Sequence, residues 1–148
     1  MSEIQKWFRD RGDHTHNITY DLNENSVVMD LGGYTGVWGQ QIINKYNPNM
    51  YILEPIGQFY NFMVDKFRSN NKVHLLNAGV STENKSGKLF EDMLKTGLIN
   101  KFKNIQIQFH LGIDGDRARR DKIREGLKEN GFKEKFNYPF VWESWYKL

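Results

Sequence analysis

A short run of acidic and small residues has the composition and spacing of a nucleotide-type binding turn. Residues 26–31 are mostly apolar and predict a buried strand, and glycines at 32, 33 and 36 follow it at once. Glycine lets the backbone approach a ligand and adopt positive φ, and the start of the next helix offers free amide groups. The residues expected to bind a cofactor in this turn are Asp30, Gly32, Gly33, Tyr34 and Gly36.

Two further strand ends carry residues that suit the same ligand. Glu54 ends the strand expected over Met50–Leu53, and Pro55 keeps it extended, so its carboxylate can accept hydrogen bonds from both hydroxyls of a ribose. Asn77 and Ala78 follow a third expected strand, where small residues leave room for a flat adenine. These residues could merely end strands and turn the chain. Their order at three successive strand ends favours a ligand.

The acid in the first turn distinguishes between two cofactor classes. A dinucleotide site has a Gly-x-Gly-x-x-Gly turn that carries pyrophosphate, whereas the glycines here stand at 32, 33, 36 and 39. Asp30 would repel pyrophosphate but suits a cation, such as the α-amino group of S-adenosylmethionine. The sequence therefore favours the methyl donor, and an NAD-dependent oxidoreductase is the least favoured alternative.

The elements that position these residues alternate between strand and helix about five times. Such alternation predicts an α/β fold with a mostly parallel sheet and helices on both faces, and a ligand beyond the carboxyl ends of the strands. Neither a repeat nor a linker divides the chain, so residues 1–148 are expected to form one domain. The expected helices are 2–9, 36–46, 57–67, 89–96 and 116–130, and the expected strands are 26–31, 50–53, 72–76, 104–110 and an aromatic segment from Phe136.

The stretch Val27–Ser81 resembles the FkbM-type branch of the class I S-adenosylmethionine-dependent methyltransferases. The resemblance rests on Asp30-Leu31-Gly32-Gly33-Tyr34-Thr35-Gly36-Val37-Trp38, Ile52-Leu53-Glu54-Pro55 and Asn77-Ala78-Gly79-Val80-Ser81, and it resumes from Leu89 to the Phe140–Trp145 segment. It implies a Rossmann-like methyltransferase fold, S-adenosyl-L-methionine as cofactor, and O-methyl transfer to a sugar or natural-product hydroxyl.

The chain departs from this family in one segment. Family members usually carry a β-rich stretch and a strand of the type Lys-x-Asp/Asn-x-Glu-Gly-x-Glu after the third-strand motif, whereas here only Ser81–Lys88 lies between that motif and the next helix. The chain thus resembles a shortened member, in which the strand Asn104–His110 could lie beside the first strand. The alternative is a catalytically degenerate module that binds the cofactor or serves interactions.

The histidines offer one catalytic candidate. His110 ends the strand that begins at Asn104, and histidine titrates near neutral pH, so it is the expected general base for a hydroxyl acceptor. His14 and His16 stand two residues apart beside Asp13 in a polar loop without a third histidine, so no metal site is expected. The aromatic segment Phe136–Tyr146 is expected to be core, with a substrate wall as the alternative.

Composition and charge exclude several classes. The 148 residues contain no cysteine, which removes disulfides and zinc–thiolate sites, and no apolar stretch reaches the roughly 18–20 residues of a membrane span. The absence of a signal pattern favours a cytoplasmic protein. The net charge is +3, but the charges of the helix over 116–130 are of mixed sign, which is typical of a solvated face. The expected partner is therefore a small-molecule or glycan hydroxyl acceptor, with neither nucleic acid nor membrane.

Overall fold

The structure is a computed structural model that describes residues 1–79, 86–109 and 115–148. Its contacts divide the chain into two compact units. We call Ile18–Thr82 the parallel unit, and Met1–Asn17 together with Glu83–Leu148 the antiparallel unit, after the sheet that each contains. Whether the two act as the single domain expected over residues 1–148 stays a prediction.

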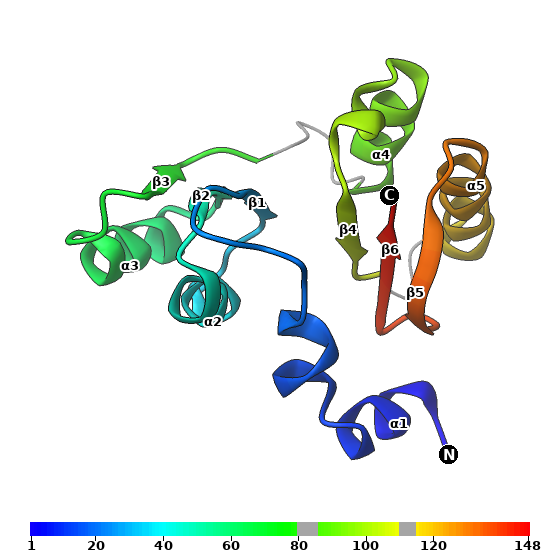
Figure 1. The fold of residues 1–148 in the computed structure, drawn as a ribbon, viewed down its shortest axis with the longest axis horizontal. Helices are drawn as coiled ribbons and strands as arrows, with labels where there is room; N and C mark the ends of the chain where they lie inside the picture. The colour runs from blue at the N-terminus through cyan, green and yellow to red at the C-terminus, as the bar shows by residue number, and fades with distance from the viewer. Residues whose placement is uncertain (80–85, 110–114) are drawn as a thin grey trace. The chain divides into compact units, whose positions relative to one another are not determined.

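The parallel unit is a three-stranded sheet with two helices (Figure 1). Its elements are β1 (Val27–Leu31), α2 (Val37–Tyr46), β2 (Asn49–Leu53), α3 (Gly57–Phe67) and β3 (Val73–Leu76). Both strand pairs are parallel, in the order β1-β2-β3, with Asp30 opposite Ile52 and Leu53 opposite Leu76. The carboxyl ends of all three strands therefore meet at one edge of this sheet.

Both helices of this unit pack on one face of its sheet. Met50 and Ile52 of β2 are fully buried against Ile43 of α2 and Met63 and Phe67 of α3. Because side chains alternate along a strand, the other face holds a second set of apolar residues. These remain exposed: Val27, Met29, Leu31, Tyr51 and Leu76. The expectation of helices on both faces is thus met on one face of this sheet.

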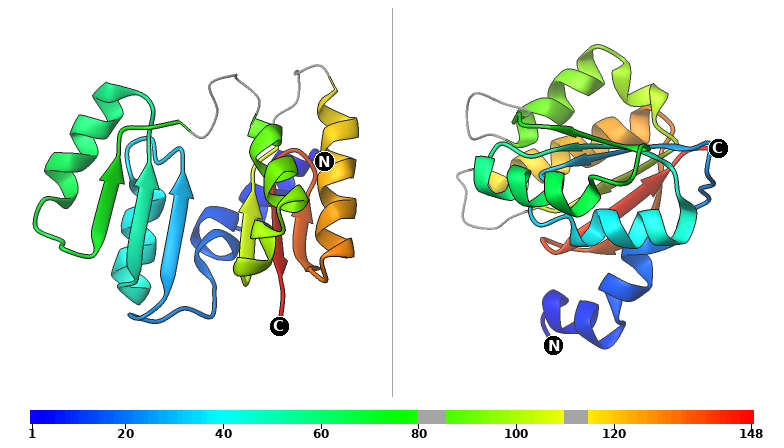
Figure 2. Two further views of the ribbon diagram at one scale, coloured as in Figure 1. Left: turned by 90° about the horizontal axis from the view of Figure 1, so that it is seen from above. Right: turned by 90° about the vertical axis from the view of Figure 1, so that its left-hand side faces the viewer.

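The antiparallel unit joins the two ends of the described chain. Its elements are α1 (Glu3–Arg9), η1 (Gly12–His14), η2 (His16–Ile18), α4 (Ser86–Lys95), η3 (Leu98–Lys101), β4 (Asn104–Ile107), α5 (Asp116–Glu129), β5 (Lys133–Tyr138) and β6 (Trp142–Tyr146). The strand order is β4-β6-β5, and both pairs are antiparallel. Figure 2 shows the three strands of each sheet side by side.

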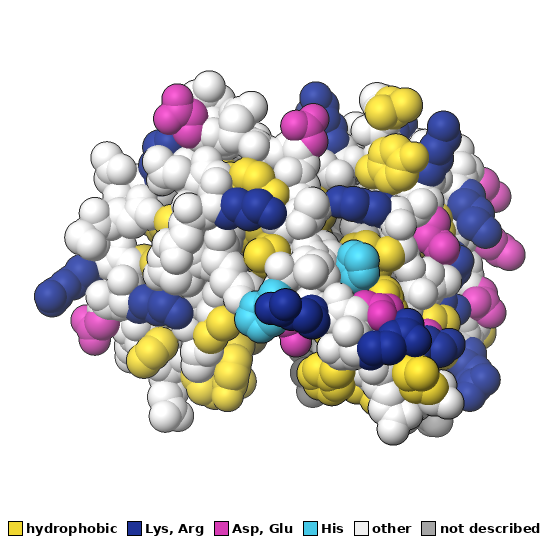
Figure 3. Space-filling model, turned by 60° about the horizontal axis from the view of Figure 1, so that its bottom comes forward, with side chains coloured by type: hydrophobic (Ala, Val, Ile, Leu, Met, Phe, Trp, Pro, Cys, Tyr) yellow, Lys and Arg dark blue, Asp and Glu magenta, His cyan; other side chains and the backbone are white. Residues whose placement is uncertain are grey.

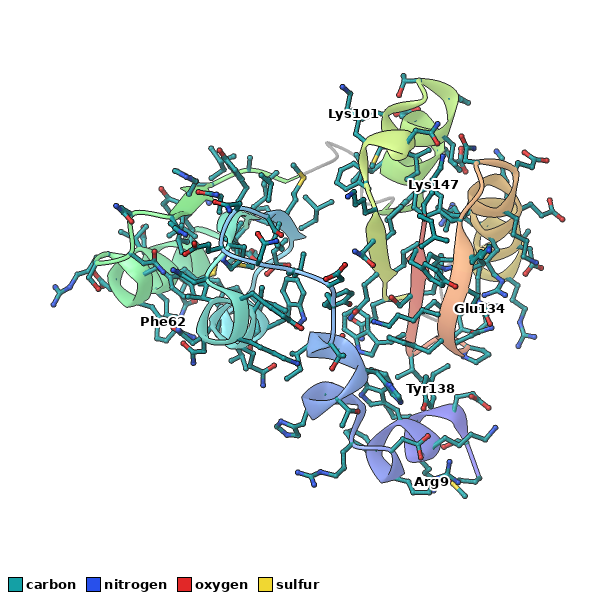
Figure 4. All side chains as sticks on the ribbon, viewed as in Figure 1. Arg9, Phe62, Lys101, Glu134, Tyr138 and Lys147 are labelled. Atoms are coloured by element: carbon teal, nitrogen blue, oxygen red, sulfur yellow. The ribbon has the colours of Figure 1, made fainter. Side chains whose placement is uncertain are left out.

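Helices cover both faces of this second sheet. One core cluster joins Ile105 and Trp145 of the sheet to Ile123 and Leu127 of α5, together with residues of α4. On the opposite face, Trp7 of α1 is 1% exposed and its ring lies 5.1 Å from the ring of Tyr138. The Tyr138 hydroxyl donates to Asp10 at 2.7 Å, and Tyr138 lies toward the Arg9 end of α1 in Figure 4. The chain's N-terminus is thus tied to its last hairpin.

Three expectations differ from the structure. The sheet is parallel only in β1-β2-β3, because β4, β5 and β6 pair antiparallel. Among the described residues, β4 pairs with β6 and β1 pairs with β2 alone, so the strand from Asn104 does not hydrogen-bond to β1. The aromatic tail is a hairpin: the amide of Val141 donates to the carbonyl of Tyr138 at 2.9 Å across a turn that contains Pro139.

Candidate functional site

The predicted cofactor residues converge at the carboxyl edge of the parallel sheet. Asp30 lies near the end of β1, Glu54 directly follows β2, and Asn77 directly follows β3. The Asn77 side-chain amide donates to the Glu54 carbonyl at 2.9 Å, which ties the second strand end to the third. The amide of Gly32 donates to the carbonyl of Leu53 at 2.8 Å, which ties the first to the second. The three strand ends therefore form one connected surface.

Glu54 holds the centre of this surface. Its side chain is buried, with the residue 4% exposed, and each carboxylate oxygen accepts one backbone amide: Tyr34 N–H and Ile56 N–H, both at 2.8 Å. These two bonds join the turn after β1 to the start of α3. A carboxylate has about four lone-pair sites. Two sites therefore remain for a ligand's hydroxyl groups.

The turn after β1 is shaped by two glycines with different roles. Gly32 has φ +92°, and a Cβ atom built there would meet nothing within 4 Å, so this position leaves open space beside the backbone. A Cβ atom on Gly33 would lie 2.3 Å from the Ile52 side chain, so this glycine lets the turn pack on the core. The sequence does not distinguish the two positions. In the structure, Gly32 borders open space and Gly33 packs on the core.

The same turn contains Tyr34 and Gly36. Tyr34 has φ +51°, an uncommon value for a bulky residue. The residue is 59% exposed, and the centroid of its ring lies 4.3 Å from that of Phe59. Gly36 has φ +67° beside Phe67. The Lys66 ammonium of α3 donates to the carbonyls of Thr35 and Gly36 at 3.0 and 3.1 Å. Lys66 was not predicted, because its only sequence signal is a lysine one position from the buried Phe67.

Asp30 stands in an environment that disfavours its charge. Burial, and after it the neighbouring Glu54 carboxylate, raises the pKa of Asp30 from 3.8 to about 6. An acid that is costly to ionise gains from a nearby cation, because an opposite charge favours the ionised form. The site therefore offers two adjacent carboxyl groups, one of them poorly neutralised by the protein.

A shallow hollow of about 130 Å³ opens at this edge. Its lining residues are Leu31, Gly32, Leu53, Pro55, Ala78 and Gly79. Sites for ligands of drug size usually measure about 300–1,000 Å³, so the hollow suits one flat part of a cofactor. The open Gly32 position, the acidic pair and this apolar hollow together fit a molecule with a cation, a hydroxylated sugar and an aromatic base.

The remaining predicted residues do not join this surface in the described part of the chain. His110, the expected general base, lies outside the described residues, as do Val80 and Ser81 of the third-strand motif. His16 packs in the aromatic cluster around Trp7, with its ring 6.1 Å from the indole. Over residues 1–79, 86–109 and 115–148, no group of three potential ligands could hold a metal ion. No helix within those ranges is long and apolar enough to cross a membrane.

Comparison with known proteins identifies the fold. No family model matches the chain, and no curated protein matches it in sequence. Among solved structures, a proposed methyltransferase of Streptococcus mutans in complex with S-adenosylhomocysteine has 13% identity and a TM-score of 0.70, with 94% of this chain and 97% of that chain covered. Fibrillarin of Aeropyrum pernix with bound S-adenosyl-L-methionine has 8% identity and a TM-score of 0.59, with 94% and 74% covered.

A third similar structure is the 23S rRNA methyltransferase ErmE, with 12% identity, a TM-score of 0.60, and 93% and 68% of the two chains covered. At these identities the similarity establishes the fold, which is the methyltransferase-like α/β fold expected from the sequence. The expected cofactor is the one that such structures hold. The FkbM family itself is not among these matches.

The expectation that excluded nucleic acid is wrong. It rested on the mixed charges of α5, and proteins with this fold include one that acts on 23S rRNA. The reason for the error is physical: two arginines of α5 are engaged in ion pairs, and the charges of this helix say nothing about the cations elsewhere. Arg120 and Arg124 both bind the buried Glu143, and Arg124 also binds Glu134 at 2.6 Å.

Proposed function

We propose that the parallel unit binds S-adenosylmethionine at the carboxyl ends of β1, β2 and β3, and that the chain is a methyltransferase. The observation that carries the proposal is the connected surface of Asp30, Glu54 and Asn77 around the Gly32 turn. The cofactor supplies an electrophilic methyl carbon on a sulfonium centre. The protein's part is to hold that molecule in place and to exclude water around it.

Each residue has a separate role in this proposal. Asp30 receives the α-amino group, whose positive charge offsets the carboxylate pair. Glu54 receives the ribose hydroxyls on its two free lone-pair sites, while it keeps its bonds to the Tyr34 and Ile56 amides. Gly32 admits the ligand beside the backbone, and Ala78 borders the hollow that accepts the adenine. Asn77 acts by holding the second and third strand ends together.

Transfer to an acceptor requires more than this surface. A hydroxyl acceptor needs a general base within about 2.6–3.2 Å of its proton, and His110 is the residue that we propose for that role. The sugar or natural-product hydroxyl implied by the FkbM resemblance has no support among the solved structures. The acceptor is therefore to be tested over several classes, including RNA.

The second candidate function is a cofactor-binding module without catalysis. It is favoured by one observation: among the described residues, no strand pairs with the outer edge of β1. In the family that the sequence resembles, a strand at that place contributes carboxylates to the acceptor pocket. A chain without it would keep the cofactor surface and lose the chemistry.

Calorimetric titration with S-adenosylmethionine, S-adenosylhomocysteine and NAD tests cofactor binding. We expect saturable binding of the first two and none of NAD. Gly32→Val should abolish it, because the side chain fills the open space beside the turn. Gly97→Val is the matched control: Gly97, in the antiparallel unit, has φ +73° and also meets nothing within 4 Å, so this variant introduces comparable backbone strain outside the proposed site. Tight NAD binding, or normal binding by Gly32→Val, would contradict the proposal.

Transfer of a labelled methyl group then separates the two candidates. We expect slow or undetectable transfer to simple glycosides and phenols, and test RNA beside them. Where transfer occurs, its rate should rise with pH through one histidine titration and vanish in His110→Ala. Cofactor binding without transfer to any acceptor class would favour the module without catalysis.

A further inference from the structure

The basic residues of the antiparallel unit fall into two groups that differ in their partners. The first lies on α5, where Arg120 and Arg124 are mostly buried and bind Glu143. Lys122 pairs with Glu91 of α4 at 3.5 Å. Figure 3 shows basic side chains next to acidic ones in the same way along its right-hand side. Cations whose charge is already neutralised contribute little to the binding of a polyanion.

The second group lies at one end of the β4-β6-β5 sheet. The amide of Lys147, directly after β6, donates to the carbonyl of Lys103, directly before β4, at 2.8 Å, so these two lysines are neighbours at one end of the sheet. Lys133, the first residue of β5, stands opposite Tyr146 of β6. Lys101 ends η3, two residues before Lys103. We call Lys101, Lys103, Lys133 and Lys147 the sheet-end lysines.

The sheet-end lysines keep their charges available. Lys101, Lys103 and Lys133 are exposed, and within the described ranges none of them forms a salt bridge. The Lys147 ammonium donates to the side-chain oxygen of Asn100 at 2.7 Å and lies 5.7 Å from the centre of the Phe132 ring. Its partners are thus a neutral amide and an aromatic face, which fix its position without neutralising it.

One half-buried aromatic residue, Tyr146, lies at the same end of the sheet, where it stands between Asn104 and Lys133. Phe102, between Lys101 and Lys103 in the chain, packs instead against the core cluster around Ile105 and Trp145. Lysines that attract phosphates and aromatic rings on which unpaired bases stack are the two components of sites for single-stranded nucleic acid. A lipid headgroup would use the lysines alone.

We propose that the sheet-end lysines bind the phosphate backbone of a single-stranded nucleic acid. The four ammonium groups contact phosphates, and the ring of Tyr146 contacts bases without reading their sequence. The binding is therefore tolerant of sequence and strongly dependent on salt. The inference uses residues of the antiparallel unit only, so it is independent of cofactor binding in the parallel unit.

Fluorescence anisotropy with a labelled oligouridylate of about 12 nucleotides tests the proposal on the full chain. Four neutralised phosphates predict a slope of log affinity against log salt of about −2.8, since each contact on a single strand contributes about −0.7. Raising the salt from 50 to 200 mM should therefore weaken binding roughly 50-fold. In Lys101→Gln/Lys103→Gln, the slope should fall to about −1.4 and the same salt change should weaken binding only about sevenfold.

The matched control is Lys6→Gln/Lys122→Gln, which changes the net charge equally. Both of its lysines already pair with a carboxylate, Lys6 with Glu3 and Lys122 with Glu91, so the slope should stay near −2.8. A Tyr146→Leu variant should weaken oligouridylate binding and leave the salt slope unchanged. Each variant is also titrated with S-adenosylmethionine, so that a loss of oligonucleotide binding is distinguished from a failure of the cofactor site.

Three results would overturn the proposal. The first is wild-type binding without a salt dependence, or no binding at 50 mM salt. The second is an equal loss in the two double variants, which would mean that overall charge acts rather than this surface. The third is tighter binding to phosphatidylserine vesicles than to oligouridylate with the same response to the lysine variants, which would identify a membrane surface. Oligothymidylate of equal length tells RNA from DNA.

Discussion

Two buried glutamates, one in each unit, show how differently a carboxylate can be accommodated. Glu54 of the parallel unit is 4% exposed and accepts two backbone amides. Glu143 of the antiparallel unit is fully buried and accepts from the guanidinium groups of Arg120 and Arg124. The first is held by neutral donors beside a second acid, and the second by two full positive charges.

The difference distinguishes a structural carboxylate from one that is available to a ligand. Two arginines neutralise Glu143 and fix α5 on the β5-β6 hairpin, because they reach it from successive turns of the helix. Glu54 forms no ion pair with any residue that the structure describes, and it lies beside Asp30, whose pKa is raised to about 6. Burial alone therefore does not identify a functional acid. What separates these two glutamates is the charge of their partners.

The largest effect is expected from Glu143→Ala. Removing one member of a buried ion pair costs about 3–5 kcal/mol, because it leaves the partner's charge unpaired. Chemical denaturation should show that loss in the antiparallel unit. The control is Glu134→Ala, which removes a 37% exposed partner of Arg124 and should cost about 0–1 kcal/mol. A loss below 1 kcal/mol in Glu143→Ala would mean that Glu143 does not fix α5.

Asp30→Asn should stabilise the protein above pH 6. The pKa of about 6 in the folded state lies above the ordinary 3.8, so the folded state binds this proton more tightly than the unfolded state. The free energy of unfolding should therefore fall as pH rises from about 4 to 6 and stay level above. The difference between the two pKa values corresponds to about 3 kcal/mol of stability. Partial solvent exposure of Asp30 reduces this to about 2 kcal/mol.

In Asp30→Asn, the free energy of unfolding should no longer fall between pH 4 and 6. Denaturation of the variant and the wild type at pH 4, 5, 6 and 8 measures this difference. At pH 8 the variant's affinity for S-adenosylmethionine should fall while its stability rises. A variant that is less stable than the wild type at pH 8 would show that the Asp30 carboxylate does not strain the fold. A rise in stability together with a fall in cofactor affinity is the result expected for an acid that binds a ligand and has no cationic partner in the protein.

The third change, Glu54→Gln, acts on the affinity for the cofactor. It keeps one acceptor oxygen for a backbone amide and removes the charge, so the affinity for S-adenosylmethionine should fall by about 1.5–3 kcal/mol. The matched change Glu143→Gln should leave that affinity unaltered. Titration calorimetry of both variants makes the comparison. Equal affinities in Glu54→Gln and the wild type would place the ribose elsewhere.

The sequence predicts the meeting of the three parallel strand ends better than it predicts the rest of the fold. Asp30, Glu54 and Asn77 could be found because each directly follows or ends a short apolar run, and parallel strand ends must meet. The ion pairs of Glu143 could not be found in this way, because 19 and 23 residues separate it from its arginines. A signal was present: Arg120 and Arg124 stand one turn apart on the side of α5 that also carries Ile123 and Leu127.

The sheet-end lysines were missed for a similar reason. Lys101, Lys103, Lys133 and Lys147 are spread over 47 positions, and they meet only because β6 runs back between β4 and β5. A search along the chain finds the dense charges of α5 instead, where Arg120, Lys122 and Arg124 already form ion pairs. Charge counted by sequence position is thus a poor guide to charge available at the surface.

The shared hydrogen bonds of Glu54 have a consequence for the motions of the turn. The Tyr34 and Ile56 amides depend on the same carboxylate, so one rotation of that side chain exposes both to solvent. Their hydrogens should exchange with deuterium at similar rates, although 22 residues separate them in the chain. A bound ligand that fills the remaining lone-pair sites should slow both together. The β1 turn and the start of α3 would then open as one cooperative event.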